Sequence, residues 1–145
     1  MELEKIRVLF VCVSNSFRSQ IAEAILNEKY GGYFEAESAG FSKKEINSLA
    51  IKVMDEYGVD ISSKSSDKLI DFYNEGRKYD YVITVCNRKE EDDCPIFPGV
   101  VARFNWNNFD DPEEYTGSDE VKLVKARELL KKIETRIDEF VNTVK

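Results

Sequence analysis

The residue pair with the clearest capacity for chemistry is Cys12 and Arg18, which have five residues between them in a polar loop. A near-continuous apolar run over 6–11 predicts a buried strand before the loop, and apolar spacing over 19–30 predicts a helix after it. A loop between a strand's carboxyl end and a helix N-terminus presents free backbone N–H groups and the positive end of a helix dipole. The stretch is therefore suited to binding a tetrahedral oxyanion.

The side chains of this loop fit the same chemistry. Arg18 supplies a planar fork of donors for a bidentate oxyanion, and the positive field favours the thiolate of Cys12, which is the nucleophilic form. A buried structural cysteine with a chance Cys-x5-Arg spacing is the alternative. The apolar strand before Cys12 and the Ser19 that begins the helix favour catalysis. The residues expected to bind the oxyanion are Ser14, Asn15, Ser16, Phe17 and Arg18.

Composition narrows the class of protein. The 145 residues, 42% of them apolar, predict one globular domain over 1–145. No apolar run has membrane-spanning length, and the start MELEKIR lacks the apolar core of a signal peptide, so we expect a cytoplasmic protein with no membrane partner. A net charge of −7 disfavours nucleic acid as a partner. Anion binding must then come from a local site.

Three cysteines and no histidine limit the chemistry further. An odd cysteine count argues against the disulfide framework of a secreted protein. Without histidine there is no imidazole base and no Cys/His zinc site, and Cys12, Cys86 and Cys94 are a poor four-ligand cage. We therefore expect no tightly bound cofactor.

The pattern of apolar residues predicts strands alternating with helices. Strands are expected over 6–11, 33–39, 81–85 and 100–106, and helices over 19–30, 46–57, 67–73 and 119–144. Such alternation predicts a three-layer α/β domain with a central four-stranded parallel sheet flanked by helices. The last helix is expected to bury one face, made of Val121, Val124, Leu129, Leu130, Ile133, Ile137, Phe140 and Val144.

Three reactive side chains follow the predicted strands. Cys12 comes after the first strand, Cys86 after the third and Asp111 after the last. The carboxyl ends of parallel strands meet at one edge of the sheet, where α/β proteins bind ligands. We therefore expect these three residues to approach one another there.

Motifs spread along most of the chain resemble one fold family. They are VLFVCVSNSFRSQIAEAIL, ESAG at 37–40, ISSKSSD at 61–67, VITVCN at 82–87, CPIFPG at 94–99 and FNWNNFDDP at 104–112. The Cys-x5-Arg loop and the Asp-Pro pair resemble the low-molecular-weight protein tyrosine phosphatase fold. The later cysteine pair, with CPIFPG and the segment before Pro112, resembles the thioredoxin-coupled arsenate reductases of that fold.

The resemblance implies a role for each site residue. Cys12 would be the nucleophile, Arg18 would bind the oxyanion and stabilise the transition state, and Ser19 would stabilise the Cys12 thiolate. Asp111 would be the general acid; Asp110 is the alternative, although the following Pro112 favours Asp111.

The same resemblance implies a redox role for the other two cysteines. Cys86 would attack Cys12 after arsenate has bound to it, and Cys94 would then take over the disulfide. An external dithiol, most simply thioredoxin, would reduce the Cys86–Cys94 disulfide. Arsenate or a phosphate-like oxyanion is the expected substrate, and the expected state is a monomer.

Members of the reductase family can also bind potassium beside the loop. The matching ligand positions here are Asn15, Glu23, Ser38 and Asp67. The sequence departs from the family pattern at four places. Phe17 replaces a loop cysteine, Lys64 replaces a common histidine, Asn47-Ser48 replaces a frequent Asn-Pro, and the Cys86–Cys94 segment is one residue longer.

Two other functions share part of this constellation. A low-molecular-weight protein tyrosine phosphatase would use the same Cys12, Arg18 and Asp111 to hydrolyse phosphate monoesters, with Tyr115 at the substrate mouth, but would not need Cys86 or Cys94. A non-enzymatic oxyanion-binding or redox-sensing module would need no general acid. Substitution of the later cysteines separates the first of these from a reductase.

Overall fold

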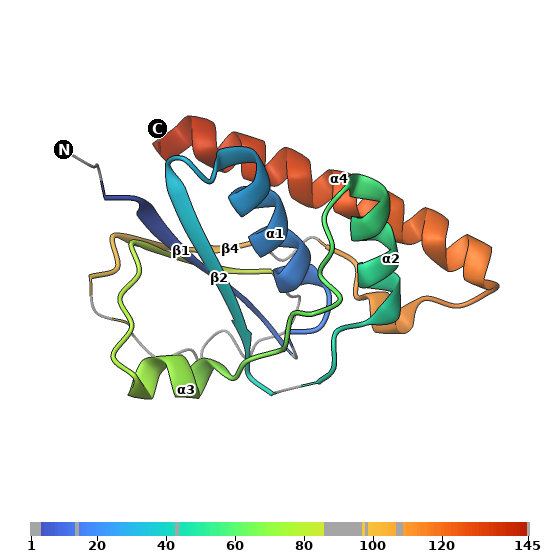
Figure 1. Cartoon of the computed structure of the whole chain (residues 1–145), viewed down its shortest axis with the longest axis horizontal. Coiled ribbons are helices and arrows are strands. Elements are labelled where there is room, and N and C mark those ends of the chain that lie inside the picture. The colour runs from blue at the N-terminus through green and yellow to red at the C-terminus, as the bar shows by residue number, and fades with distance from the viewer. Residues whose placement is uncertain are drawn as a thin grey trace.

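The computed structural model describes residues 4–13, 15–42, 44–85, 97, 99–106 and 109–144. They form a four-stranded, fully parallel sheet in the order β2-β1-β3-β4 with helices packed against it (Figure 1). This is the predicted α/β architecture. The strands are β1 (Ile6–Cys12), β2 (Phe34–Gly40), β3 (Tyr81–Thr84) and β4 (Ala102–Asn105). The helices are α1 (Arg18–Tyr30), α2 (Ser48–Tyr57), α3 (Leu69–Asn74), the short 3-10 helix η2 (Pro112–Glu114) and α4 (Asp119–Val144).

Strand β1 lies in the middle of the sheet and is buried on both faces. Val8, Leu9, Phe10 and Val11 have no exposed surface, as their continuous apolar run predicts. Because β1 pairs with both β2 and β3, its carboxyl end and Cys12 lie at the centre of one sheet edge. The sheet therefore presents Cys12 where ligands of parallel α/β proteins bind.

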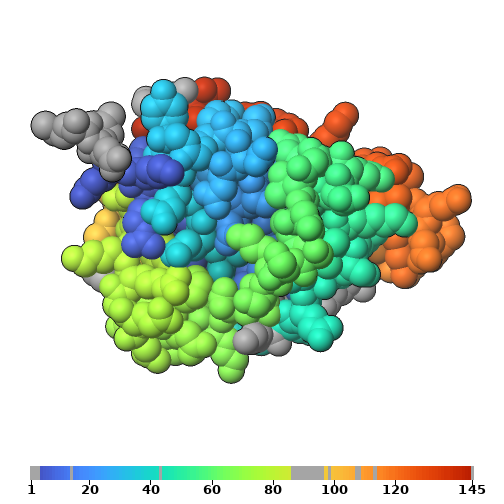
Figure 2. Space-filling view, in the orientation of Figure 1, coloured from blue at the N-terminus to red at the C-terminus, as the bar shows by residue number. Residues whose placement is uncertain are grey.

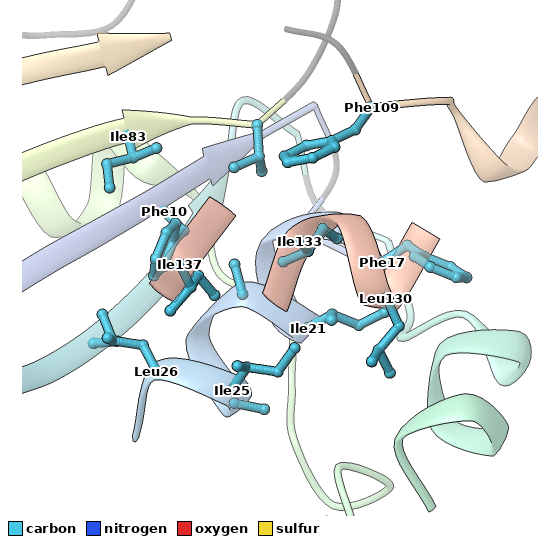
Figure 3. Packing of buried hydrophobic residues seen from close by; sticks show 14 of the residues in the cluster. Phe10, Phe17, Ile21, Ile25, Leu26, Ile83, Phe109, Leu130, Ile133 and Ile137 are labelled. Atoms are coloured by element: carbon cyan, nitrogen blue, oxygen red, sulfur yellow. The ribbon is translucent and has the colours of Figure 1, made fainter. Parts of the chain in front are cut away.

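Two apolar clusters lie on opposite faces of the sheet, which makes three layers. The larger cluster joins one face of β1 to α1, α2 and α4, and Figure 3 shows Phe10 and Ile83 of the sheet above Ile21, Ile133 and Ile137 of the helices. The smaller cluster packs α3 against the other face through Leu9, Val11, Ala39, Leu69, Phe72, Tyr79, Val82 and Phe97.

Capping residues and glycines in the sequence mark the helix ends that the structure shows. Asn47 caps α2 by accepting the N–H of Leu49 over 2.8 Å, and Gly58 ends that helix in the left-handed region with φ 103°. Glycine favours this conformation because it has no Cβ. Gly31 follows the last residue of α1, as expected.

The expected inner face of the last helix needs one correction. Val121 and Val124 are 45% and 48% exposed, whereas the buried face of α4 begins at Ala126. Figure 1 shows the N-terminal turns of α4, coloured orange, running out past α2. Val121 and Val124 come before the row of buried side chains that starts at Ala126, so helical spacing alone misassigned them. No helix in the described parts of the chain is long and apolar enough to cross a bilayer.

Candidate active site

The loop after β1 is held by backbone hydrogen bonds from two later segments. The N–H groups of Phe41 and Ser42 donate to the carbonyls of Cys12 and Val13 over 3.2 and 2.9 Å. The N–H of Asn47 donates to the carbonyl of Ser16 over 2.9 Å. The loop is thus fixed by the chain that leads from β2 into α2.

The sulfur of Cys12 lies among hydrogen-bond donors. Its Sγ accepts the backbone N–H of Asn15 over 3.2 Å and lies 2.8 Å from the Oγ of Ser19. Cys12 is 3% exposed and Ser19 is fully buried. Donors around a sulfur favour its anionic form, which is the nucleophile.

A chain of hydrogen bonds sets the direction of the Ser19 hydroxyl. The backbone N–H of Asp67 donates to Oδ1 of Asn15 over 2.8 Å, which fixes that atom as the acceptor. The Nδ2 of Asn15 must then donate to the Oγ of Ser19, also over 2.8 Å. Because Ser19 accepts from Asn15, its own proton is free to point at Cys12. The arrangement makes Ser19 a donor to the thiolate.

Asn15, which donates to Ser19, has an unusual backbone conformation. Its φ is 53°, and no other non-glycine residue in the described ranges has a positive φ. Asparagine tolerates the left-handed region better than most residues. Gln20, which is also buried, holds Asn15 by donating from Nε2 to its backbone carbonyl and Oδ1 over 3.2 and 3.1 Å.

Arg18 brings a buried guanidinium to the same place. It is 6% exposed, and its Nη2 lies 3.8 Å from Oδ1 of Asp111. Its Nη1 is buried and has no hydrogen-bond partner within the described part of the chain. A buried donor without a partner is costly, so the geometry favours an acceptor supplied by a ligand.

A small cavity lies between the loop and η2. Its volume is about 20 Å³, enough for about one water molecule. A tetrahedral oxyanion is larger than a water molecule, so the cavity must widen to hold one. The lining residues are Cys12, Ser16, Phe17, Arg18, Asn47, Asp111 and Pro112.

The start of α1 is open to an anion. Phe17 is the N-cap residue of the helix, and its side chain makes no capping hydrogen bond to the first N–H groups. Uncapped N–H groups and the positive helix end attract an anion at this position.

Tyr115 lies at the edge of this site, in a groove that also includes Asn47 and Pro112. Burial, and after it the nearby Asp110 carboxylate, raise the pKa of Tyr115 to about 12, although Arg18 acts in the opposite direction. Tyr115 therefore stays neutral near the oxyanion site.

The structure brings together four of the predicted site residues: Cys12, Arg18, Ser19 and Asp111. Asn15, Ser16 and Phe17 lie in the same loop. The predictions for Ser14, Cys86 and Cys94 lie outside the described residues.

Two contributors were missed from the sequence. Gln20 supports Asn15, and Asn47 lines the cavity and anchors Ser16. A glutamine one position into a helix carries no signal of burial. Asn47 was predicted only as part of a helix start.

The four positions predicted for potassium fall into two hydrogen-bonded pairs. Ser38 donates to Glu23 over 2.8 Å, and the N–H of Asp67 donates to Asn15. The Glu23 carboxylate also contacts the ammonium of Lys64. With Lys64 in that position, these residues do not fit a potassium ion.

A buried thiol, a guanidinium and a carboxyl group around one small cavity define a site where a thiolate can attack a tetrahedral oxyanion. The chain belongs to the low molecular weight phosphotyrosine protein phosphatase family, whose model matches residues 7–145. The resemblance predicted from the motifs is thus confirmed.

Curated relatives are named for reduction of arsenate. Arsenate reductases from Shouchella clausii and Bacillus subtilis are each 36% identical to this chain, over 137 and 139 residues. The alignments cover 94% and 95% of this chain and 95% and 96% of the two relatives.

Solved structures agree with both branches of the family. An arsenate reductase in the phosphate binding state superposes with a TM-score of 0.78 at 26% identity, covering 97% of this chain and 99% of the other. The thioredoxin-dependent arsenate reductase of Corynebacterium glutamicum gives 0.73 at 31%, covering 99% and 63%. A low molecular weight protein tyrosine phosphatase from T. tengcongensis gives 0.77 at 26%, covering 97% and 100%.

Proposed function

We propose that this chain is an arsenate reductase that uses Cys12, Cys86 and Cys94 in sequence and is recycled by thioredoxin. The relatives named arsenate reductase support the activity, and the thioredoxin-dependent neighbour supports the reductant. Such a cycle needs thiols that are kept reduced, so we assign it to the cytoplasm.

The strongest structural support for the cysteine sequence is one backbone hydrogen bond between β1 and the end of β3. Val85, the residue before Cys86 in the sequence, donates its N–H to the carbonyl of Val11 over 2.8 Å. Val11 is the residue before Cys12. Val85 therefore lies beside the strand end that bears the nucleophile, and this supports a role for Cys86, the next residue in the sequence, as the second thiol.

The first step forms a bond between sulfur and arsenic. The Cys12 thiolate attacks arsenate while Arg18 and the loop N–H groups hold the remaining oxygens. Once it has left Arg18, Asp111 takes up a proton from solvent and donates it to the oxygen, which leaves as water. Asp111 must first part from Arg18, so the incoming oxyanion takes over the guanidinium.

The second step moves two electrons to arsenic. The Cys86 thiolate attacks the Cys12 sulfur, the sulfur–arsenic bond breaks, and its electron pair reduces arsenic(V) to arsenic(III). Arsenite leaves and a Cys12–Cys86 disulfide remains. Cys94 then attacks Cys86, which frees Cys12, and thioredoxin reduces the Cys86–Cys94 disulfide by the same exchange.

Phosphate monoester hydrolysis is the competing function. It is favoured by the similarity to the tyrosine phosphatase and by the fact that Cys12, Arg18 and Asp111 suit either oxyanion. Phosphorus(V) is not reduced by a second thiol, so its adduct would be hydrolysed by water. We assign this to a side activity.

Steady-state assays of cysteine variants distinguish the two functions. Arsenate-dependent oxidation of NADPH, coupled through thioredoxin and thioredoxin reductase, should occur in the wild type and disappear in Cys86→Ser and Cys94→Ser. Hydrolysis of p-nitrophenyl phosphate should survive in both variants. Fast hydrolysis with no arsenate turnover in the wild type would assign the chain to the phosphatases.

A further inference from the structure

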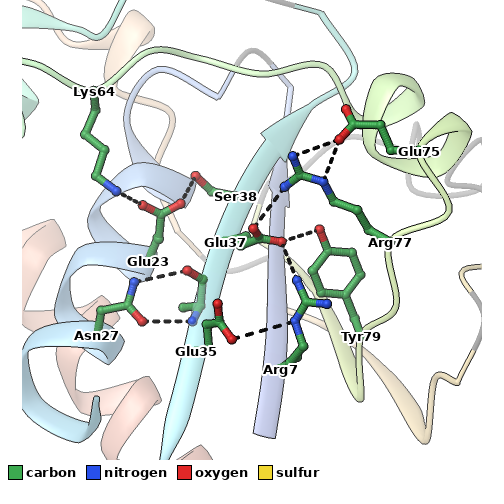
Figure 4. Close-up of polar contacts among 11 residues, drawn as sticks. Arg7, Glu23, Asn27, Glu35, Glu37, Ser38, Lys64, Glu75, Arg77 and Tyr79 are labelled. Atoms are coloured by element: carbon green, nitrogen blue, oxygen red, sulfur yellow. Dashed lines mark hydrogen bonds and ion pairs between the residues drawn. The ribbon is translucent and has the colours of Figure 1, made fainter. Parts of the chain in front are cut away.

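A buried carboxylate on α1, Glu23, has no part in the reaction above. Its side chain is 9% exposed. Ser38 donates to Oε1 over 2.8 Å, and the ammonium of Lys64 contacts Oε2. Figure 4 shows Ser38 approaching from β2 and Lys64 from the segment that follows α2. A carboxylate this deeply buried needs a positive partner.

The site around Glu23 is where the family resemblance predicts a potassium ion. Asn15 is one of the predicted potassium ligands, and its Oδ1 accepts the backbone N–H of Asp67. The positive charge next to Glu23 belongs to Lys64 instead.

We propose that the ammonium of Lys64 replaces the monovalent cation, so that the loop keeps its shape without potassium. Both carry one positive charge, but the ammonium is tethered and so has a high effective concentration at Glu23. The Lys64 side chain is 46% exposed. Its stem crosses the surface while its head reaches the buried carboxylate, which is usual for lysine.

The segment that carries Lys64 also supports the nucleophile. The carbonyl of Ser65 accepts from Gln20, and the N–H of Asp67 donates to Asn15. Asn15 in turn donates to the sulfur of Cys12. In the space-filling view, the residues after α2, coloured green, lie against the blue surface of α1 (Figure 2). Lys64 therefore holds the segment 64–67 against α1, and this segment in turn supports Asn15. Lys64 acts as a positioning residue.

The role of Lys64 is tested by measuring how potassium affects two properties of the protein. Neither measurement needs arsenate. The first is the thermal unfolding midpoint. The second is the rate at which iodoacetamide alkylates Cys12 in the reduced chain. Both are measured in potassium chloride and in tetramethylammonium chloride at equal ionic strength, for the wild type, Lys64→Gln, Lys64→Arg and Lys68→Gln. Lys68→Gln is the matched control, because it removes the same charge from a nearby exposed lysine.

The wild type, Lys64→Arg and Lys68→Gln should give the same values in both salts. Lys64→Gln should unfold about 3–8 °C lower in tetramethylammonium chloride. Its Cys12 should also react several-fold more slowly. Potassium chloride should restore at least half of each loss, because the vacated position then accepts the ion.

Three results would overturn the proposal. The first is a change in the unfolding midpoint or alkylation rate of the wild type between the two salts. The second is a Lys64→Gln variant with the wild-type midpoint and rate. The third is a loss in Lys64→Gln that potassium chloride does not restore. The third result would mean that Lys64 makes only an ordinary ion pair with Glu23 and does not take the place of a cation. Since no readout involves arsenate, the test stands even if the chain proves to be a phosphatase.

Discussion

The guanidinium of Arg18 lies 3.8 Å from the carboxylate of Asp111, across the cavity that contains the sulfur of Cys12. This pair joins the oxyanion-binding residue to the proposed acid. The two side chains, of opposite charge, therefore face each other beside the sulfur that attacks the substrate.

Asp111→Asn should slow formation of the Cys12 adduct about 10²- to 10⁴-fold, because the leaving oxygen loses its proton donor. Binding of phosphate as an inhibitor should be kept or become tighter, because the oxyanion no longer has to displace a carboxylate from Arg18. Rapid-quench measurement of the first turnover tests this. Asp110→Asn is the matched control, since Asp110 is its exposed neighbour. If Asp110→Asn gives the larger loss, the acid is Asp110.

Ser19→Ala should lower the nucleophilic reactivity of Cys12. A hydrogen bond to a charged group contributes about 1.5–3 kcal/mol. Its loss corresponds to about a 10- to 100-fold fall in rate. The rate of Cys12 alkylation by iodoacetamide at neutral pH measures the effect, with Ser65→Ala as the control because that side chain is exposed. Equal rates in both variants would mean that Ser19 does not stabilise the thiolate.

Asn15→Ala and Asn15→Gly separate the contacts of this side chain from its backbone conformation. Both variants lose the bonds to Ser19, Gln20 and Asp67, which should cost about 2–4 kcal/mol of unfolding free energy. Alanine should cost about 1 kcal/mol more than glycine, because only glycine adopts a positive φ freely. Urea unfolding measures both. An alanine variant as stable as the glycine variant would show that the loop relaxes out of the left-handed region.

Much of this architecture was predictable from local patterns. The apolar run before Cys12 predicted a strand buried on both faces, and Gly58 predicted a helix end, because burial and positive φ each restrict residue type. Parallel pairing then brought Cys12 and the loop before Asp111 to one edge, since strand ends share a direction.

What was missed depends on contacts between distant segments. The direction of the Ser19 hydroxyl follows from the N–H of Asp67, and the burial of Gln20 follows from its bond to the carbonyl of Ser65. Val121 is apolar, yet it is 45% exposed at the start of α4, before the row of buried side chains begins. Spacing within one element contains no information on these relationships.

Cys94→Ser should release one arsenite per chain and then stop. Cys86 could still attack the Cys12 adduct, but the resulting Cys12–Cys86 disulfide would have no internal thiol to resolve it. Arsenite measured by chromatography against protein concentration gives the stoichiometry. Cys86→Ser is the companion variant and should release none. Continued turnover of Cys94→Ser with thioredoxin would refute the resolving role of Cys94.

Disulfide mapping of the reduced protein after exposure to arsenate, without any added reductant, tests the central claim most directly. Peptide mass spectrometry should find a Cys86–Cys94 disulfide together with one equivalent of arsenite. Phosphate in place of arsenate should leave all three thiols reduced, as should arsenate with the Cys12→Ser variant. If the wild type meets arsenate and keeps three free thiols while it hydrolyses a phosphate ester, the chain is a phosphatase and not a reductase.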